Sequence, residues 1–245
     1  PGIGAAALTG VGLFAPILML LNAFAMLVGS GGAPRAAIAM GKKDNDLAEK
    51  ILGNCFTLLV GLAVVLTVVF YVSAPTLLRL FGASDVTLTY ASDYARIYIL
   101  GSFFVLIVLG MNTFITTQGF ARISMMTTVI GAVINIILDP IFIFVLDMGI
   151  KGAAIATVIS QILSALLVFY FLHGKSELKV RWIHINEISE CTRHARDIIS
   201  LGSAGFIMQL TNSLVSICCN NVLSVTGGDI YISVMTIISS VRQMV

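Results

Sequence analysis

The sequence predicts an all-α integral membrane protein, a bundle of helices that crosses a lipid bilayer several times. Three observations support this fold class: 58% of the 245 residues are hydrophobic, only 11% are charged, and the mean hydropathy is +1.02. A soluble domain carries about 25% charged residues, so this chain cannot cover its surface with polar groups. The net charge of only +2 also argues against a nucleic-acid partner. The lipid bilayer is therefore the expected partner of most of the surface.

The charged residues divide the chain into apolar intervals long enough to cross a hydrocarbon core, which takes about 20 helical residues. These intervals predict six complete transmembrane helices, at residues 1–34, 51–78, 97–121, 123–146, 152–174 and 198–228. Helices are favoured over barrel strands because the apolar runs are continuous, with no polar residue at every second position. A seventh run, after Asp229, stops short of a full span. Since the first run follows Pro1 and Gly2 directly, we expect a fragment of a longer protein.

The basic residues predict the orientation of these helices. Alternate loops place eleven of them on one side, namely Arg35, Lys42, Lys43, Lys50, Arg122, Lys175, Lys179, Arg181, Arg193, Arg196 and Arg242. Only Arg79, Arg96 and Lys151 fall on the other side. Because basic loops stay in the cytoplasm, the loops at 35–50, 118–122 and 175–197 are predicted to be cytoplasmic.

Two of the predicted cytoplasmic loops contain helix signals. Residues 42–50 begin with residues typical of a helix N-cap and lead into the second span. In residues 183–197, apolar side chains recur at intervals of three to four with charges between them. This pattern predicts an amphipathic helix at the membrane surface that joins two halves of the protein.

The sequence contains no recognisable catalytic or metal-binding motif. Its four cysteines include no CxxC pair, and no GxSxG or HExxH motif occurs. The three histidines lie in or beside the linker at 175–197. We therefore expect neither an enzyme nor a bound metal or organic cofactor.

Asp139 is the only charged residue inside a predicted span. A carboxylate in a bilayer costs roughly 2.5–3.5 kcal/mol on insertion scales, so such a residue usually faces a polar partner. Asn135 lies four residues earlier, on the same helical face. Pro140 follows directly, and since proline has no N–H, the carbonyl of Ile136 loses its usual donor. A carboxylate, an amide and a free carbonyl therefore meet on one turn.

The following span supplies further oxygen atoms. A short turn near Gly149 makes the two spans an antiparallel hairpin, in which Thr157 is predicted opposite Asp139 and Gln161 opposite Asn135. Such a set suits Na⁺, which prefers oxygen ligands, or a proton carried by the carboxylate. The alternative is a purely structural role, with a neutral Asp139 hydrogen-bonded to Asn135.

Two other polar groups are less specific. A cluster near the cytoplasmic end of the third span, which includes Asn112 and Thr116, is typical of hydrogen bonding between helices. On the sixth span, Gln209, Asn212, Ser213 and Ser216 form a polar stripe at helical spacing. That stripe predicts either the wall of a water-filled cavity or a contact between helices.

Several segments resemble the MATE (multidrug and toxic compound extrusion) family, in its bacterial DinF-like branch. The most specific is NIILDP at residues 135–140, followed by MGIKGAAIATVISQ at 148–161, which resemble the fifth and sixth helices of that family. Upstream, GKKDNDLAEKILGN at 41–54 is similar to its loop between helices two and three. The resemblance extends to Leu80–Ala83 and to Gln118–Gly119, and so runs along nearly the whole chain.

The resemblance implies twelve helices in two lobes around a central cavity. Residues 1–174 would be the first lobe without its first helix, 175–197 the linker between the lobes, and 198–245 the start of the second lobe. It also implies a monomer in the bacterial plasma (inner) membrane that exports small cationic amphipathic compounds in exchange for H⁺ or Na⁺.

The resemblance further implies a cation site at Asn135, Asp139 and Thr157, with Pro140 allowing the helix to bend. Gln161, Gln209 and Asn212 are our own candidates for residues that line the cavity. Two alternatives remain open: a flippase of the same superfamily that moves a lipid-linked saccharide, and a membrane scaffold that transports nothing.

Overall fold

The structure, a computed structural model, describes residues 5–174, 176, 178–180 and 188–244. The described residues form five α-helices before the linker, α1 (Ala5–Gly41), α2 (Asn45–Leu80), α3 (Asp85–Thr117), α4 (Ala121–Pro140) and α5 (Gly149–Gly174). A π-helix, η1 (Ile141–Val145), extends α4, and α6 (Ile188–Met244) follows the linker. Six of the helical segments are long and apolar enough to cross a membrane, and a shorter apolar helix follows at Ile230–Ser239. The predicted all-α membrane fold, with six spans and a short seventh, is confirmed.

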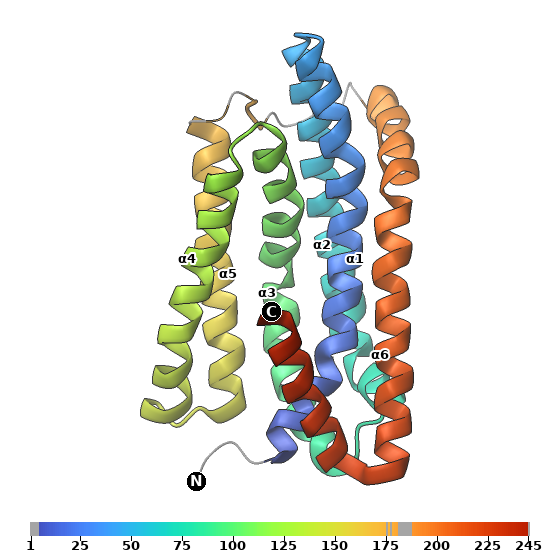
Figure 1. Ribbon diagram of the computed structural model, residues 1–245, viewed down its shortest axis with the longest axis vertical. Coiled ribbons are helices and arrows are strands. Elements are labelled where there is room, and N and C mark those ends of the chain that lie inside the picture. Colours follow the sequence, from blue (N-terminus) through green and yellow to red (C-terminus); the bar gives the residue numbers. More distant parts are fainter. Residues whose placement is uncertain (1–4, 175, 177, 181–187, 245) are drawn as a thin grey trace.

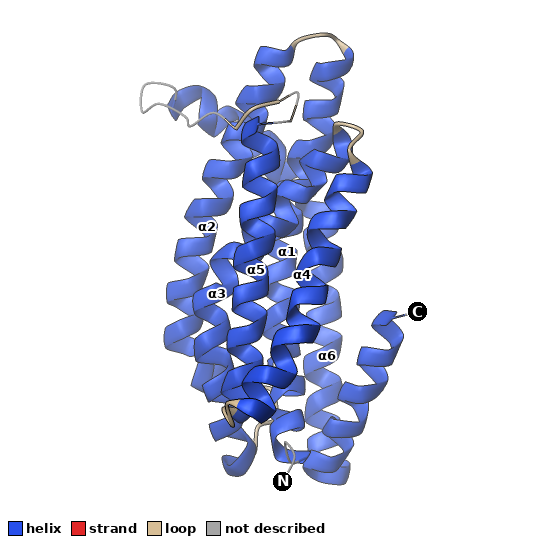
Figure 2. Ribbon diagram, turned by 90° about the vertical axis from the view of Figure 1, so that its left-hand side faces the viewer, coloured by secondary structure: helices blue, strands red, loops and turns tan. Residues whose placement is uncertain are grey.

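The helices run nearly parallel to one another along the long axis of the molecule (Figures 1 and 2). α1 packs against α2, α3 and α6, and α5 packs against α3 and α4. α4 and α5 form a hairpin at one side of the bundle in Figure 1, and α6 lies at the other. Successive connections therefore alternate between the two ends, as the predicted orientation requires.

The long helix α6 contains the sixth span and the start of the seventh. At Gly228 the backbone adopts φ 64° and ψ −159°, a conformation that glycine reaches without the steric cost of a Cβ atom. The chain reverses there, and the last segment returns along the bundle (Figure 1). Of the predicted amphipathic helix at 183–197, residues 183–187 lie outside the described residues, and from Ile188 onward the chain is helical and continuous with the sixth span.

Two helix starts illustrate how the local sequence determines the boundaries. Asp44 caps α2, its side chain accepting a hydrogen bond from the Leu47 amide at 3.1 Å. Ser84 and Thr87 form a reciprocal capping box at the start of α3. The predicted third span was too short at this end: α3 begins at Asp85, not near residue 97. Asp93 and Arg96 lie within the helix, where the carboxylate of Asp93 pairs with Lys151 of α5 at 3.3 Å.

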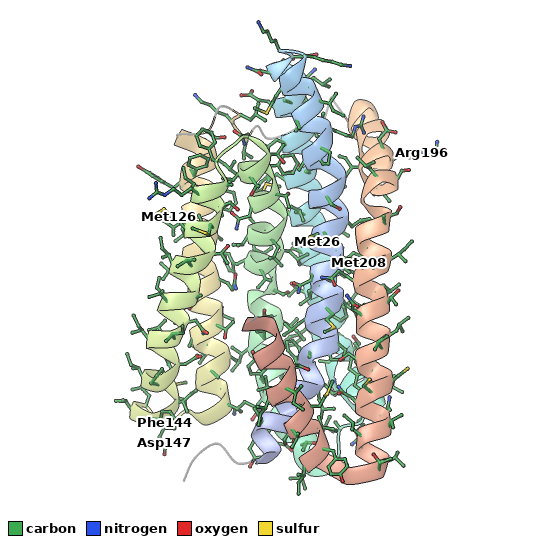
Figure 3. All side chains as sticks on the ribbon, viewed as in Figure 1. Met26, Met126, Phe144, Asp147, Arg196 and Met208 are labelled. Carbon is green, nitrogen blue, oxygen red and sulfur yellow. The ribbon has the colours of Figure 1, made fainter. Side chains whose placement is uncertain are left out.

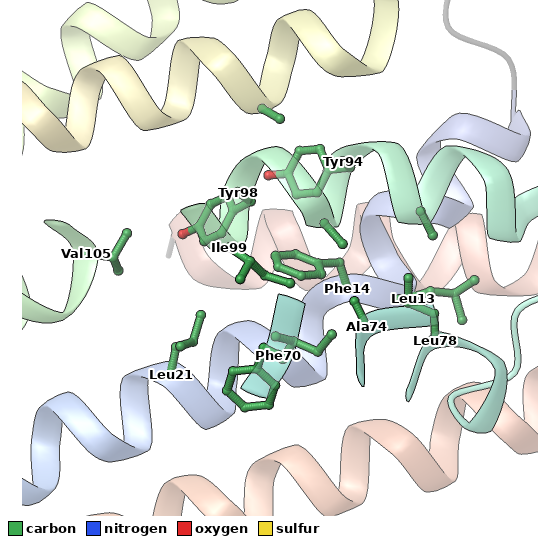
Figure 4. Packing of buried hydrophobic residues seen from close by; sticks show 14 of the residues in the cluster. Leu13, Phe14, Leu21, Phe70, Ala74, Leu78, Tyr94, Tyr98, Ile99 and Val105 are labelled. Carbon is green, nitrogen blue, oxygen red and sulfur yellow. The ribbon is translucent and has the colours of Figure 1, made fainter. Parts of the chain in front are cut away.

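A buried aromatic cluster fills the bundle in the half that contains the α4–α5 turn. Phe14 of α1 contacts Tyr94 and Tyr98 of α3 edge to face, with ring centroids 5.3 and 5.2 Å apart. The two tyrosine rings stack at 5.8 Å, and Figure 4 shows Phe14 beneath both of them. This cluster fixes α3 against α1 and presents the tyrosines toward α5.

Candidate cation site

Asp139 lies in the last turn of α4, within the segment Ala121–Val145 that is long enough to span a membrane. Its side chain is half-buried, as are those of Asn135 and Thr157. Much of the remaining surface of α4 is exposed and apolar, including Val133, Ile136 and Ile137. The carboxylate is thus held on the side of α4 that faces the other helices.

Asn135 connects the three predicted site residues. Its amide nitrogen donates to Asp139 Oδ1 at 3.2 Å and lies 3.4 Å from Thr157 Oγ1 on α5. The Thr157 hydroxyl donates in turn to the carbonyl of Ala153 at 2.9 Å, which leaves its lone pairs to accept from Asn135. The structure therefore brings Asn135, Asp139 and Thr157 together across the hairpin.

The register of the hairpin differs slightly from the prediction. Asn135, expected opposite Gln161, reaches Thr157 instead. One contribution comes from η1, where the Leu146 amide donates to the Ile141 carbonyl five residues earlier. A π-turn holds one more residue per turn than an α-turn, so α4 and η1 together advance less along the axis than an α-helix of equal length.

Pro140 stands at the junction of α4 and η1. Because it has no N–H, the α-helical hydrogen-bond ladder is interrupted directly after Asp139. Gly152 of α5 lies against this irregular turn: a Cβ atom there would come within 2.7 Å of the Phe142 carbonyl oxygen. The close approach of α5 positions Thr157 beside α4.

The other candidates lie apart from this cluster. Gln161 is half-buried one turn further along α5, and the hydrogen bonds described for Asn135 and Asp139 do not include it. On α6, Asn212 donates to Gln209 at 3.1 Å, and Asn212 is exposed. Ser213, in the same polar stripe, donates to the Pro16 carbonyl of α1 at 3.1 Å. At least part of that stripe therefore joins two helices.

Tyr94 was not among the residues predicted for the site. This buried residue of α3 lies near enough to Thr157 and Asp139 for its side chain to interact with both. Tyr94 escaped notice because the charged neighbours Asp93 and Arg96 placed it in a predicted loop. Its spacing from Tyr98, four residues on, was the available signal that both rings share a helical face.

The cluster offers a carboxylate, an amide and two hydroxyl groups inside a membrane-spanning bundle. Among the described residues, no three His, Cys, Asp or Glu side chains come together as a transition-metal site would require. A single carboxylate with neutral oxygen atoms matches a monovalent cation or a proton. The fold and this site together define a polytopic helical membrane protein with an ionisable group held in the span.

Comparison with known proteins identifies the family. The MatE family model matches residues 2–141, and the chain belongs to that family, as the sequence motifs indicated. The chain is 27% identical to the multidrug export protein MepA of Staphylococcus haemolyticus over 220 residues, which are 90% of this chain and 48% of that protein.

Solved structures give the same result. The inward-facing conformation of a multidrug resistance MATE family transporter matches with a TM-score of 0.88 at 30% identity, covering 96% of this chain and 53% of the other. The MATE multidrug transporter DinF-BH matches with a TM-score of 0.83 at 35% identity, covering 96% of this chain and 52% of the other. This likeness supports the DinF-like branch.

The chain spans about half the length of the relatives it matches. Its six apolar spans and bacterial relatives make it a multi-pass protein of the bacterial plasma (inner) membrane.

Proposed function

We propose that the protein exports small cationic amphipathic compounds in exchange for H⁺ or Na⁺ by alternating access. The observation that carries this proposal is the hydrogen-bonded chain Asp139–Asn135–Thr157 inside a membrane-spanning hairpin. The names of the relatives support the same activity, since they are a multidrug export protein and MATE multidrug transporters. In this proposal the coupling ion is the only small ligand besides the exported compound, and the protein acts as a monomer.

Asp139 carries the coupling cation in this mechanism. The charged carboxylate accepts a hydrogen bond from the Asn135 amide. When H⁺ or Na⁺ binds, the charge in the span is neutralised. A cation shifts the balance between outward-open and inward-open states only if it binds one of them more tightly. Asn135 belongs to α4 and Thr157 to α5. A movement of one helix relative to the other changes the distance between these side chains, and therefore alters the affinity of the site for the cation.

The hinge of the mechanism is the turn after the site. Pro140 lets the end of α4 bend, and Gly152 allows η1 to lie directly on α5. Gln209 and Asn212 of α6 are proposed to line the cavity that receives the exported compound.

The test uses the full-length protein in liposomes, with efflux of a fluorescent cationic dye followed under an imposed Na⁺ or pH gradient. Asp139→Asn should abolish the gradient-driven part of efflux. Asp147→Asn is the matched control: it makes the same chemical change at the exposed turn after η1, where Figure 3 shows Asp147 near Phe144. Wild-type efflux by folded Asp139→Asn protein would refute the proposed role of Asp139.

Dye efflux under neither gradient, with the protein shown to be folded, would favour the flippase or the scaffold. The gradient that drives wild-type efflux identifies the coupling ion.

A further inference from the structure

Polar side chains continue from the cation site toward the end of the bundle predicted to be cytoplasmic. A second cluster lies between α3 and α4, where the Thr127 hydroxyl donates to Asn112 Oδ1 at 3.0 Å and Asn112 Nδ2 lies 3.4 Å from Thr128 Oγ1. The hydroxyl of Ser164, on α5, donates to the Thr127 carbonyl at 3.2 Å. Three helices thus meet at polar contacts, as they do at Asp139.

The polar residues of α4 share one face of that helix. Ser124, Thr128, Asn135 and Asp139 are separated by four, seven and four residues, spacings that return to the same side after one or two turns. At 1.5 Å per residue they extend over about 22 Å. Ser124 lies in the first turn of α4, next to the predicted cytoplasmic loop at 118–122.

Gln161 stands between the two clusters. It follows Thr157 by four residues and precedes Ser164 by three on α5, so one helical turn separates it from each. Its side chain is half-buried. Ser160, its neighbour on α5, also lies between the two clusters, but it is buried and its hydroxyl donates to the Ala156 carbonyl of its own helix at 2.8 Å.

The hydroxyl protons along this row are directed at backbone carbonyls. Thr128 donates to the Ser124 carbonyl at 3.3 Å, and both Thr116 and Ser124 donate to the Asn112 carbonyl, at 3.0 and 3.3 Å. Thr157 donates to Ala153 in the same way. A hydroxyl has one proton and two lone pairs, so these oxygens remain available as acceptors. A row of acceptors stabilises a cation or the water that carries a proton, and does not suit an anion.

We propose that this row, Asp139–Asn135–Thr157–Gln161–Thr127/Thr128–Asn112–Ser124, is the route by which the coupling cation moves between Asp139 and the cytoplasm. The inference rests on the proposed function, because it assigns a path to the cation of that mechanism. The path lies between α3, α4 and α5, and therefore within one lobe, apart from the compound that is exported. In this route Gln161 links the two clusters, because its side chain is longer than that of Ser160, whose hydroxyl is bonded to its own helix.

The test measures access of water to single cysteines in the full-length protein. Gln161→Cys and Thr128→Cys are made in an active background whose native cysteines are replaced by serine. The matched control is Leu166→Cys, because Leu166 is 58% exposed on α5 and points away from Gln161. A membrane-impermeant thiol reagent is added from the cytoplasmic side, with and without a saturating cationic dye.

Both row cysteines should react at least about tenfold faster than Leu166→Cys, because a thiol forms the reactive thiolate in water and not in lipid. Saturating dye should leave both rates unchanged. Equal rates for Gln161→Cys and Leu166→Cys would overturn the route, even if Thr128→Cys reacts. Protection of Gln161→Cys by the dye would also overturn it and assign Gln161 to the drug cavity.

A second variant gives an independent readout. Gln161→Leu should slow gradient-driven efflux several-fold while the affinity for the dye stays the same, and Gln161→Asn should retain most of the rate. Undiminished efflux by Gln161→Leu would contradict the route. Labelling does not depend on coupled transport, so a failure of the proposed function, seen as normal efflux by Asp139→Asn, is distinguishable from a failure of the route.

Discussion

The guanidinium of Arg35, on α1, lies 2.9 Å from the carboxylate of Asp197, on α6. This ion pair joins α1 to the first part of α6 at the end of the bundle predicted to be cytoplasmic. Arg35 is the more buried partner, with 26% of its side chain exposed against 51% for Asp197. One guanidinium nitrogen, Nη1, is buried without a hydrogen bond to any residue that the structure describes. Loss of Asp197 therefore leaves a partly buried charge without a counter-ion, whereas loss of Arg35 leaves a carboxylate that is exposed to solvent.

This difference predicts unequal effects of two neutralising substitutions. Asp197→Asn leaves the partly buried Arg35 charge without its counter-ion, which should cost about 1–3 kcal/mol. Arg35→Gln leaves only a half-exposed carboxylate that water can solvate, so its cost should stay below about 1 kcal/mol. Thermal unfolding in detergent compares the two. A larger loss of Tm for Arg35→Gln would contradict this prediction.

Directly beside the ion pair, α1 and α6 touch through their backbones. A Cβ atom at Gly202 would lie 1.8 Å from the Leu27 carbonyl oxygen, and one at Gly31 would lie 2.0 Å from that of Ile198. Small residues let membrane helices approach this closely. Gly202→Ala should therefore separate the helices and destabilise the protein by about 1–3 kcal/mol, as overpacking does.

The control for this prediction is Gly61→Ala. Within the described part of the chain, no atom beyond the adjacent residues and the nearby backbone of α2 lies within 4 Å of a Cβ built there, and alanine is favoured over glycine in a helix by about 1 kcal/mol. The two alanine variants should shift Tm in opposite directions. If both variants shift Tm in the same direction, helix propensity, and not the α1–α6 contact, dominates the effect of Gly202→Ala.

The pattern of spans could be predicted because each span is an uninterrupted apolar run. The proximity of Asp139, Asn135 and Thr157 could be predicted too, because the spacing of four residues and the short turn at Gly149 constrain where those side chains lie. The position of Tyr94 could not be predicted, because it depends on how α3 packs against α5. The start of α3 was misplaced because Asp93 and Arg96 were read as loop charges, whereas Asp93 forms an ion pair with Lys151 on a neighbouring helix.

Tyr94 provides a third prediction. Its side chain lies near Thr157 and Asp139, so we expect its hydroxyl to contribute an oxygen atom to the proposed site. Tyr94→Phe should raise the Na⁺ or H⁺ concentration for half-maximal efflux several-fold, because a typical neutral hydrogen bond is worth about 0.5–1.5 kcal/mol. Efflux measured against cation concentration tests this.

Tyr98→Phe is the matched control for Tyr94→Phe. Tyr98 stacks on Tyr94 and contacts Phe14 in the same cluster, so both variants remove one hydroxyl from the same buried group. Equal shifts in cation dependence would mean that the aromatic cluster as a whole, and not the Tyr94 hydroxyl, sets the affinity of the site.

The last prediction concerns Pro140. An alanine there restores an N–H that can donate to the Ile136 carbonyl, so the α-helix can continue through the turn that now contains η1. Pro140→Ala should therefore raise Tm, while the straighter helix should slow gradient-driven efflux, since a more rigid helix trades activity for stability. Ile137→Ala, at an exposed apolar position of α4, controls for the loss of a side chain from the same helix. Unchanged efflux together with a higher Tm would show that the interruption of α4 after Asp139 has no part in transport.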